Sequence, residues 1–365
     1  MALLNQPSHP KALTLVILAA ILQGCGLGAN PPAASLPPPS ISTDRSVMVE
    51  RWQDGRTLFD YDAEEPLNLV LADLPFASNE RASLFEISYD SPRGGRVPAS
   101  LILPASEGPF AAVIVMHGLP GNRHDLDRQF LDAAGHDVAA IFIDAPFNRP
   151  GHSRSGSSSD IVTFTPQDRD EQIQLIVDLR RAVDVLASFP IVDERRIGYL
   201  GISYGAAMGG LLAGVEDRIA AYVLAVGDGG LVEHFLGPDD ASGRLLSLQA
   251  PQRDAWIAAM EPIEPLYFVG QTDAPLFFQA AEHDEFIPRP DSERYHSAAP
   301  DGSVVQWYDS GHDLPISAWC DAGAWLGSAI DVDAGAFHGC ATATGLAPRG
   351  TVPSRSVALA QAVDR

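Results

Sequence analysis

Short, almost wholly apolar runs alternate along this chain with segments of helical periodicity. The runs at 111–116, 138–143, 219–226 and 275–281 are typical of strands buried on both faces of a sheet. Residues 167–188 instead repeat apolar side chains every three or four positions, which predicts an amphipathic helix. Strands and helices in alternation predict an α/β fold, with a mostly parallel central sheet and helices on both faces.

Weaker patterns extend this plan on both sides. Residues 84–89 and 97–104 have strand-like alternation around the turn cluster Ser91–Gly95, which predicts a hairpin. Residues 125–134 and 291–298 are predicted helices, each following one of the buried strands. The plan therefore combines a hairpin with repeated strand–helix units.

The chain is expected to divide into five segments. They are a lipoprotein signal peptide at 1–24, a Pro-rich tether at 25–46, a peripheral lead-in at 47–83, the α/β domain at 84–330 and a tail at 331–365. Within the domain, residues 229–264 lack a strand pattern, and we expect a small cap there. Patterning is already weak from Trp319 onward, so no regular element is predicted beyond that residue.

The first residues have the pattern of an export signal. Lys11 precedes the apolar run Ala12–Leu22, whose length suits a signal peptide better than a membrane span. The letters LQGC, which end at Cys25, resemble a bacterial lipobox, in which the cysteine is lipidated and becomes the new N-terminus. We therefore expect an exported protein, anchored through Cys25 to a bacterial membrane on the periplasmic or cell-surface side. An ordinary signal peptide with an incidental cysteine, or a plain membrane anchor, is the alternative.

Two cysteines follow the lipobox, Cys320 and Cys340. In an exported protein an even number of remaining cysteines predicts a disulfide. Two buried free thiols are the alternative interpretation.

The charge balance excludes one class of partner. The chain has 24 Lys+Arg against 47 Asp+Glu, a formal net charge of -23, whereas nucleic-acid binding requires basic patches. The sequence contains no phosphate-binding loop of the G-x-x-x-x-G-K type and no Cys, His and Asp set with metal-ligand spacing. We therefore expect neither a cofactor nor a metal ion, and the pattern leaves the oligomeric state open.

The strongest chemical signal is G-x-S-x-G at Gly201–Gly205, between a short apolar strand and a helix of small residues. In a sharp strand-to-helix turn the serine hydroxyl stands clear of the sheet, and glycines are needed where a Cβ would collide. The helix N-terminus that follows favours developing negative charge. Ser203 is therefore the candidate nucleophile, with a Gly-rich helix cap as the alternative interpretation.

A serine nucleophile needs a base, and the base needs an acid to orient it. Asp284 follows one predicted strand and His312 follows the next, at 303–307, which is the expected chain order of serine, acid and histidine. Asp228, which follows the strand after Ser203, is the main rival acid. Other polar residues that follow strands are weaker candidates: Glu282, Glu285, His283, His117 and Asp144.

Four motifs together resemble the α/β-hydrolase superfamily: G-x-S-x-G at Gly201–Gly205, HGLPG at His117–Gly121, EHDEFIP at 282–288, and Gly311-His312. The resemblance covers about 84–326 and is greatest to dienelactone-hydrolase-like and acyl-esterase or prolyl-oligopeptidase-type catalytic domains.

The resemblance assigns a role to each matching residue. It implies that Ser203 is the nucleophile, Asp284 the acid and His312 the base, and that the backbone amides of Leu119 and Tyr204 form the oxyanion hole. It also implies that His117 and Asp144 are structural. The expected activity is hydrolysis of a small-molecule carboxylic ester through an acyl-enzyme. A prolyl-oligopeptidase-like peptidase and a non-catalytic lipoprotein binding module are the alternatives.

Overall fold

The computed structural model describes residues 41–133, 138–151, 161–236 and 244–332. Within these residues ten strands form one sheet. In chain order they are β1 (Val70–Leu71), β2 (Ala77–Ser78), β3 (Ala82–Asp90), β4 (Arg96–Pro104), β5 (Phe110–Met116), β6 (Val138–Ile143), β7 (Val192–Ile202), β8 (Ile219–Ala225), β9 (Leu276–Ala281) and β10 (Val304–Tyr308). The predicted hairpin at 84–104 and every predicted strand are present, with bounds that differ by up to a few residues.

The sheet is parallel through its centre and antiparallel at one side. The strand order is β1-β3-β4-β6-β5-β7-β8-β9-β10, and β2 pairs with β3 outside this path. All neighbours from β6 to β10 run parallel, so their carboxyl ends lie along the same edge. Ligands of open parallel sheets bind at this edge, and the predicted Ser203, Asp284 and His312 follow β7, β9 and β10 there.

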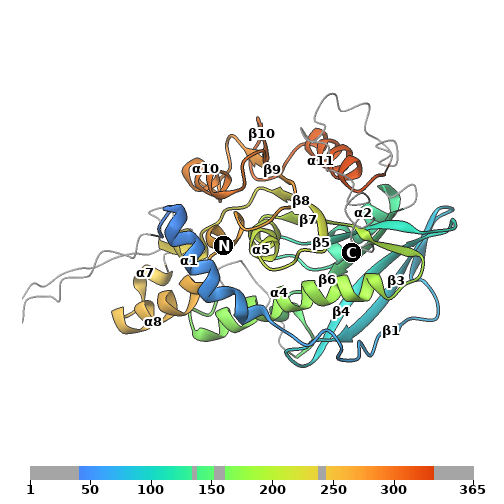
Figure 1. The fold of residues 1–365 in the computed structure, drawn as a ribbon, viewed down its shortest axis with the longest axis horizontal. Coiled ribbons are helices and arrows are strands. Elements are labelled where there is room, and N and C mark those ends of the chain that lie inside the picture. The colour runs from blue at the N-terminus through green and yellow to red at the C-terminus, as the bar shows by residue number, and fades with distance from the viewer. Residues whose placement is uncertain (1–40, 134–137, 152–160, 237–243, 333–365) are drawn as a thin grey trace, which may run out of the picture. The chain divides into compact units, whose positions relative to one another are not determined.

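Helices and short 3₁₀ turns connect the strands, as Figure 1 shows. The helices are α1 (Arg45–Gly55), α2 (His124–Ala133), α4 (Pro166–Ala187), α5 (Tyr204–Ala213), α6 (Leu231–Leu236), α7 (Arg244–Ser247), α8 (Ala250–Met260), α9 (Pro265–Phe268), α10 (Arg289–Ala298) and α11 (Ile316–Ala329). The 3₁₀ turns are η1 (Arg56–Phe59), η2 (Pro146–Asn148) and η3 (Glu261–Ile263). Every helix within the described ranges is too short or too polar to span a bilayer.

Two apolar cores lie on the two faces of the sheet, because successive strand residues point to opposite sides. In β5, Ala112, Ile114 and Met116 belong to the core that also contains residues of α4 and α5. Val113 and Val115 belong to the other core, together with residues of α2 and α11. Both faces of β5 are buried, which is why its sequence is an unbroken apolar run.

The longest helix, α4, begins at a strong start signal. The Thr165 hydroxyl accepts a hydrogen bond from the Gln167 N–H, and Pro166 occupies the first helical position, where no N–H is needed. One turn into the helix, the Asp168 carboxylate accepts a hydrogen bond from Trp256 Nε1 at 2.8 Å. This bond ties α8, part of the helical segment between β8 and β9, to the body of the domain.

The segment expected to form a cap, 229–264, is helical over its described residues. It contains α6, α7, α8 and η3, and it is inserted between β8 and β9. Trp256 and Ile263 are fully buried in the same core as α4, so this segment packs on the domain. Whether it closes over a substrate remains a prediction.

The prediction that no regular element follows Trp319 is wrong, because α11 continues to Ala329. Its buried positions Ala318, Ala322, Trp325 and Leu326 recur at helical spacing. Alanine and glycine elsewhere on the helix reduce the contrast between the buried and exposed faces, and this masks the periodicity in the sequence. The helix is nevertheless integral, because Trp325 contacts the ring of Phe277 in β9, with centroids 5.4 Å apart.

Several predictions concern residues outside the described ranges. The signal peptide, Cys25 and nearly all of the tether lie before residue 41, and Cys340 lies in the tail after residue 332. Cys320 is a buried residue of α11. Its disulfide with Cys340 therefore stays a prediction.

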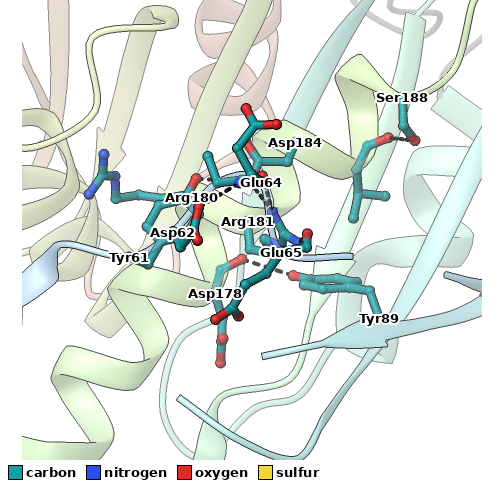
Figure 2. A network of polar contacts seen from close by, with 12 residues as sticks. Tyr61, Asp62, Glu64, Glu65, Tyr89, Asp178, Arg180, Arg181, Asp184 and Ser188 are labelled. Carbon is teal, nitrogen blue, oxygen red and sulfur yellow. Dashed lines mark hydrogen bonds and ion pairs between the residues drawn. The ribbon is translucent and has the colours of Figure 1, made fainter. Parts of the chain in front are cut away.

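The lead-in, predicted to be peripheral, contributes to the core. Met48 and Phe59 are buried, and the Phe59 ring packs edge-on against Phe268 with centroids 5.6 Å apart. Polar contacts fix residues 61–65, the segment that follows Phe59, as Figure 2 shows. Arg181, buried in α4, donates to the Ala63 carbonyl at 3.0 Å and to the Glu65 carbonyl.

Replacing Arg181 with methionine is expected to destabilise the fold by about 3 kcal/mol, because it removes the buried guanidinium that donates to the Ala63 and Glu65 carbonyls and to Asp184. Urea unfolding should show a lower midpoint at an unchanged m-value. Arg195 is the matched control, since its side chain is 85% exposed and, among the described residues, it pairs with the nearby Asp193 alone. Equal midpoints for Arg181→Met and Arg195→Met would contradict this account.

Candidate active site

The turn between β7 and α5 has the strained geometry expected of a nucleophile elbow. Ser203 has φ 54° and ψ -115°, which a residue with a side chain adopts only under strong constraint. Two glycines permit the turn. A Cβ at Gly201 would stand 2.2 Å from the Gly205 carbonyl oxygen, and one at Gly205 would stand 2.3 Å from the Met116 carbonyl oxygen. The Ser203 N–H donates to the Ala225 carbonyl at 2.8 Å, which fixes the turn against β8.

Two backbone amides near this serine in the chain or in the fold have no hydrogen-bond partner among the described residues. Tyr204 is the first residue of α5, so its N–H has no partner within the helix. The loop after β5 passes directly beside the elbow, because a Cβ at Gly118 would lie 3.1 Å from Ser203 Cβ. Leu119 is the next residue of that loop, and its N–H forms no hydrogen bond with any residue of the described ranges. Tyr204 follows Ser203 directly and Leu119 follows the glycine that lies beside Ser203, and their role as oxyanion donors stays a prediction.

An ion-pair network fixes the loop that carries Leu119. The Arg123 N–H donates to Asp144 Oδ1 at 3.0 Å, and its guanidinium binds Asp144 Oδ2 and, at 3.0 Å, Glu86. The Asn148 amide donates to the Gly121 carbonyl. Asp144 thus has the loop-fixing position that the resemblance implied, whereas Arg123 was missed, because a lone arginine after a loop carries no motif.

The predicted base and acid form a direct hydrogen bond. His312 Nδ1 lies 2.9 Å from both carboxylate oxygens of Asp284, whose side chain is only 3% exposed. Asp284 Oδ1 also accepts N–H groups from Phe286 and Ile287, each at 2.9 Å. A carboxylate held in this way keeps the Nδ1–H tautomer, so Nε2 remains the nitrogen that can accept a proton.

The loop that carries His312 is held by main-chain bonds to its neighbour. The N–H of Glu282 donates to the Tyr308 carbonyl at 2.8 Å, and the N–H of His283 donates to the Ser310 carbonyl at 3.0 Å. The His312 N–H donates to Glu285 Oε2 at 3.0 Å, and this bond lowers the pKa of the Glu285 carboxyl group. Glu285 therefore contacts the main chain of the histidine loop, and Asp284 contacts the ring.

The rival candidates have other partners. Asp228 Oδ2 lies 3.1 Å from Nδ1 of His234 in α6, so its partner histidine is not His312. Glu282 pairs with Arg289, and His283 with Asp309. His117 is buried, which lowers the pKa of its imidazole, and its Nδ1 lies 2.8 Å from the Gly118 carbonyl.

Ser203 and His312 share the carboxyl edge of the sheet, but no hydrogen bond joins them in this structure. The Ser203 hydroxyl bonds to no residue of the described ranges, and Ser203 is partly exposed. One apolar cluster at this edge connects their strands, since Ile202 packs against a group that includes Tyr308 and Leu314. In enzymes without substrate this contact is often long, and it tightens when substrate binds.

Two solved structures that align with most of this chain identify its fold. An acetyl xylan esterase from Paenibacillus sp. R4 aligns with a TM-score of 0.62 at 17% identity, covering 77% of this chain and 93% of its own. Acetyl xylan esterase 1 from Thermoanaerobacterium sp. JW/SL YS485 aligns with a TM-score of 0.63 at 16% identity, covering 76% and 92%. The chain has the α/β-hydrolase fold.

Sequence comparison adds a family match over part of this chain. Residues 61–227 match the acetyl xylan esterase family (AXE1). That segment contains Leu119, Ser203 and Tyr204 and ends before Asp284 and His312. A mouse relative, mitochondrial acyl-coenzyme A thioesterase 2, is 30% identical over 135 residues, or 37% of this chain. The match spans only about a quarter (26%) of the mouse protein. These comparisons support an esterase of the serine hydrolase class.

The described residues contain no group of three or more His, Cys, Asp or Glu side chains that could bind a metal ion. The polar chemistry at the strand edge is that of a serine, a histidine and carboxylates.

The network around Arg123 predicts an effect on turnover. Arg123→Met is expected to lower kcat about 10-fold to 100-fold with little change in KM, since it loosens the loop that presents the Leu119 amide to the developing oxyanion. Arg128→Met is the matched control, because Arg128 is an exposed arginine of the nearby helix α2, with its guanidinium 5.4 Å from the exposed Phe76 ring. Steady-state kinetics on a short ester measure both; equal kcat values would show that Arg123 does not position the loop.

Proposed function

We propose that this protein is a serine hydrolase that cleaves carboxylic esters, with Ser203 as nucleophile, His312 as base and Asp284 as acid. The observation that carries the proposal is the bond between His312 Nδ1 and Asp284 at the sheet edge where the strained Ser203 stands. The arrangement fits acyl transfer, because a fixed imidazole at the same sheet edge as the serine can supply both the proton acceptor and the proton donor that the reaction needs.

Each step of the mechanism uses a named group. Ser203 Oγ attacks the ester carbonyl carbon while its proton passes to His312 Nε2. The carbonyl oxygen becomes an oxyanion and accepts hydrogen bonds from the Leu119 and Tyr204 amides. The bond between the acyl carbon and the alcohol oxygen then breaks, and His312 gives its proton to that oxygen. Water, deprotonated by His312, attacks the acyl-enzyme, which releases the carboxylic acid and restores the Ser203 hydroxyl.

We infer that the acyl group is short, and that acetyl esters are the first substrates to test. The family that matches residues 61–227 and both aligned structures carry acetyl xylan esterase in their names. A p-nitrophenyl ester series from acetyl to octanoyl, together with acetylated xylan, gives the acyl preference directly. Highest kcat/KM for acetyl is expected, whereas a peak at octanoyl would contradict the short-acyl proposal.

The same assay decides between the alternative functions. Turnover of a proline-containing dipeptide amide without ester turnover would favour the peptidase. Absence of turnover on every ester and amide, with no labelling by a fluorophosphonate probe, would favour a binding module. Ester turnover with labelling supports the proposed hydrolase.

Export and lipidation form a separate proposal, which rests on residues 11–25 alone. The full chain, expressed in bacteria with radiolabelled palmitate, is expected to incorporate label and to fractionate with membranes, and Cys25→Ala should abolish both. Label retained in Cys25→Ala would exclude a lipid at that residue.

A further inference from the structure

An exposed aromatic ring lies directly beside the proposed base. Phe286 is 54% exposed, although the ring of a phenylalanine gains from burial. Its centroid lies 5.0 Å from the centroid of the His312 imidazole, and the two ring planes meet at 79°. This is the edge-to-face geometry that aromatic pairs prefer. One part of the Phe286 ring therefore packs on the imidazole, and the rest faces solvent.

The position of Phe286 is set by the same carboxylate that orients the base. Its N–H donates to Asp284 Oδ1 at 2.9 Å, and the next N–H, from Ile287, donates to the same oxygen at 2.9 Å. Ile287 is 6% exposed and anchors the loop in the domain. The backbone that carries the ring is thus fixed at two consecutive residues, so the exposed ring is a preorganised surface beside the base.

The reaction brings the alcohol part of an ester to this place. His312 Nδ1 faces Asp284, so Nε2 must donate the proton to the leaving oxygen, at a distance of about 3 Å. A methyl group on that oxygen is too short to reach past the imidazole. A benzyl or naphthyl group extends several ångströms further. This length is comparable to the 5.0 Å between the ring centroids of Phe286 and His312, so such a group can reach the phenylalanine.

On this geometry, and resting on the proposed ester hydrolysis, we propose that Phe286 determines specificity for the alcohol part of the substrate by packing against large apolar or ring-shaped alcohols. Phe286 lies within the EHDEFIP motif, from which no role for its side chain could be predicted. The contact is made in the transition state of acylation, when the alcohol is still attached, so it acts on kcat/KM. After the alcohol leaves, hydrolysis of the common acyl-enzyme is independent of Phe286.

A series of acetate esters with alcohols of increasing size tests this proposal. Comparing parent and Phe286→Ala, the loss in kcat/KM is expected to grow from less than about 3-fold for methyl acetate to about 10-fold or more for benzyl and 2-naphthyl acetate. Phe286→Leu should retain most of the activity on the large esters. In a second series, acyl length varies on a fixed alcohol, and there the ratio of parent to variant should stay constant.

Ile191→Ala is the matched control, because Ile191 is also an exposed apolar residue (37%) but precedes β7, at the opposite edge of the sheet. It should leave both series unchanged.

If Phe286→Ala lowers kcat/KM equally for all alcohols, or shifts the pH profile, Phe286 serves only to hold His312, and the proposal is wrong. No loss for any alcohol would overturn it as well. Ester turnover that persists in Ser203→Ala would instead overturn the proposed function, and this inference with it.

Discussion

The Ser203→Ala variant is expected to hydrolyse p-nitrophenyl acetate with kcat reduced on the order of 10⁵-fold. The variant lacks the oxygen that forms the acyl-enzyme, and His312 has no hydroxyl to deprotonate. The residual rate would come from the oxyanion amides and from binding alone. Stopped-assay kinetics at high enzyme concentration measure the loss, because the expected rate lies near the uncatalysed background.

Folding must be preserved for this comparison to have meaning. Ser203 holds a φ of 54°, and alanine, like serine, carries a Cβ, so the backbone strain is the same in both proteins. Equal urea midpoints would show that the fold is unchanged. A Ser203→Ala protein that retained more than about a hundredth of the parent rate would exclude Ser203 as the nucleophile.

Replacing Asp284 with asparagine is expected to lower kcat on the order of 10⁴-fold. The neutral amide can still accept the N–H groups of Phe286 and Ile287, so the loop should keep its shape. It cannot stabilise a positively charged imidazole, and its NH₂ group favours the wrong tautomer of His312. The effect should therefore appear in kcat while the free energy of unfolding changes little.

Asp228→Asn is the matched control for this substitution. Asp228 follows β8, the other strand end at which the sequence placed a candidate acid, and it is 6% exposed, but its histidine partner is His234 at 3.1 Å. Its removal should leave kcat within about tenfold of the parent, since no contact joins it to His312. A larger loss in Asp228→Asn than in Asp284→Asn would reverse the assignment of the acid.

Much of the fold could be predicted because the strands at the centre of the sheet are buried on both faces. Residues 138–143 form β6 with the predicted bounds, and 111–116 differ from β5 by one residue. Helix α11 could not be predicted, because alanine and glycine hide its buried face. The lead-in appeared peripheral because Leu58 and Phe59 form only a short apolar pair between polar residues, and the burial of Phe59 depends on Phe268, far along the chain.

The candidate site likewise contains some residues that could be predicted from the sequence and others that could not. Ser203, Asp284 and His312 carry local signals, namely the elbow glycines and the strand that precedes each residue. No motif assigns a role to Arg123 or Phe286, and the role proposed for each depends on a contact in space: with Asp144 for the arginine, and with the His312 ring for the phenylalanine. Sequence pattern finds groups whose backbone surroundings are unusual, and it misses groups whose function depends only on a neighbour in space.

The most direct test of the account is intact-protein mass spectrometry after reaction with a fluorophosphonate. A single covalent adduct is expected on the parent protein, located by peptide mapping at Ser203, and much slower labelling is expected in His312→Ala. Ser203→Ala should gain no mass. An adduct on another residue, or ester hydrolysis by a protein that the probe leaves unlabelled, would contradict it.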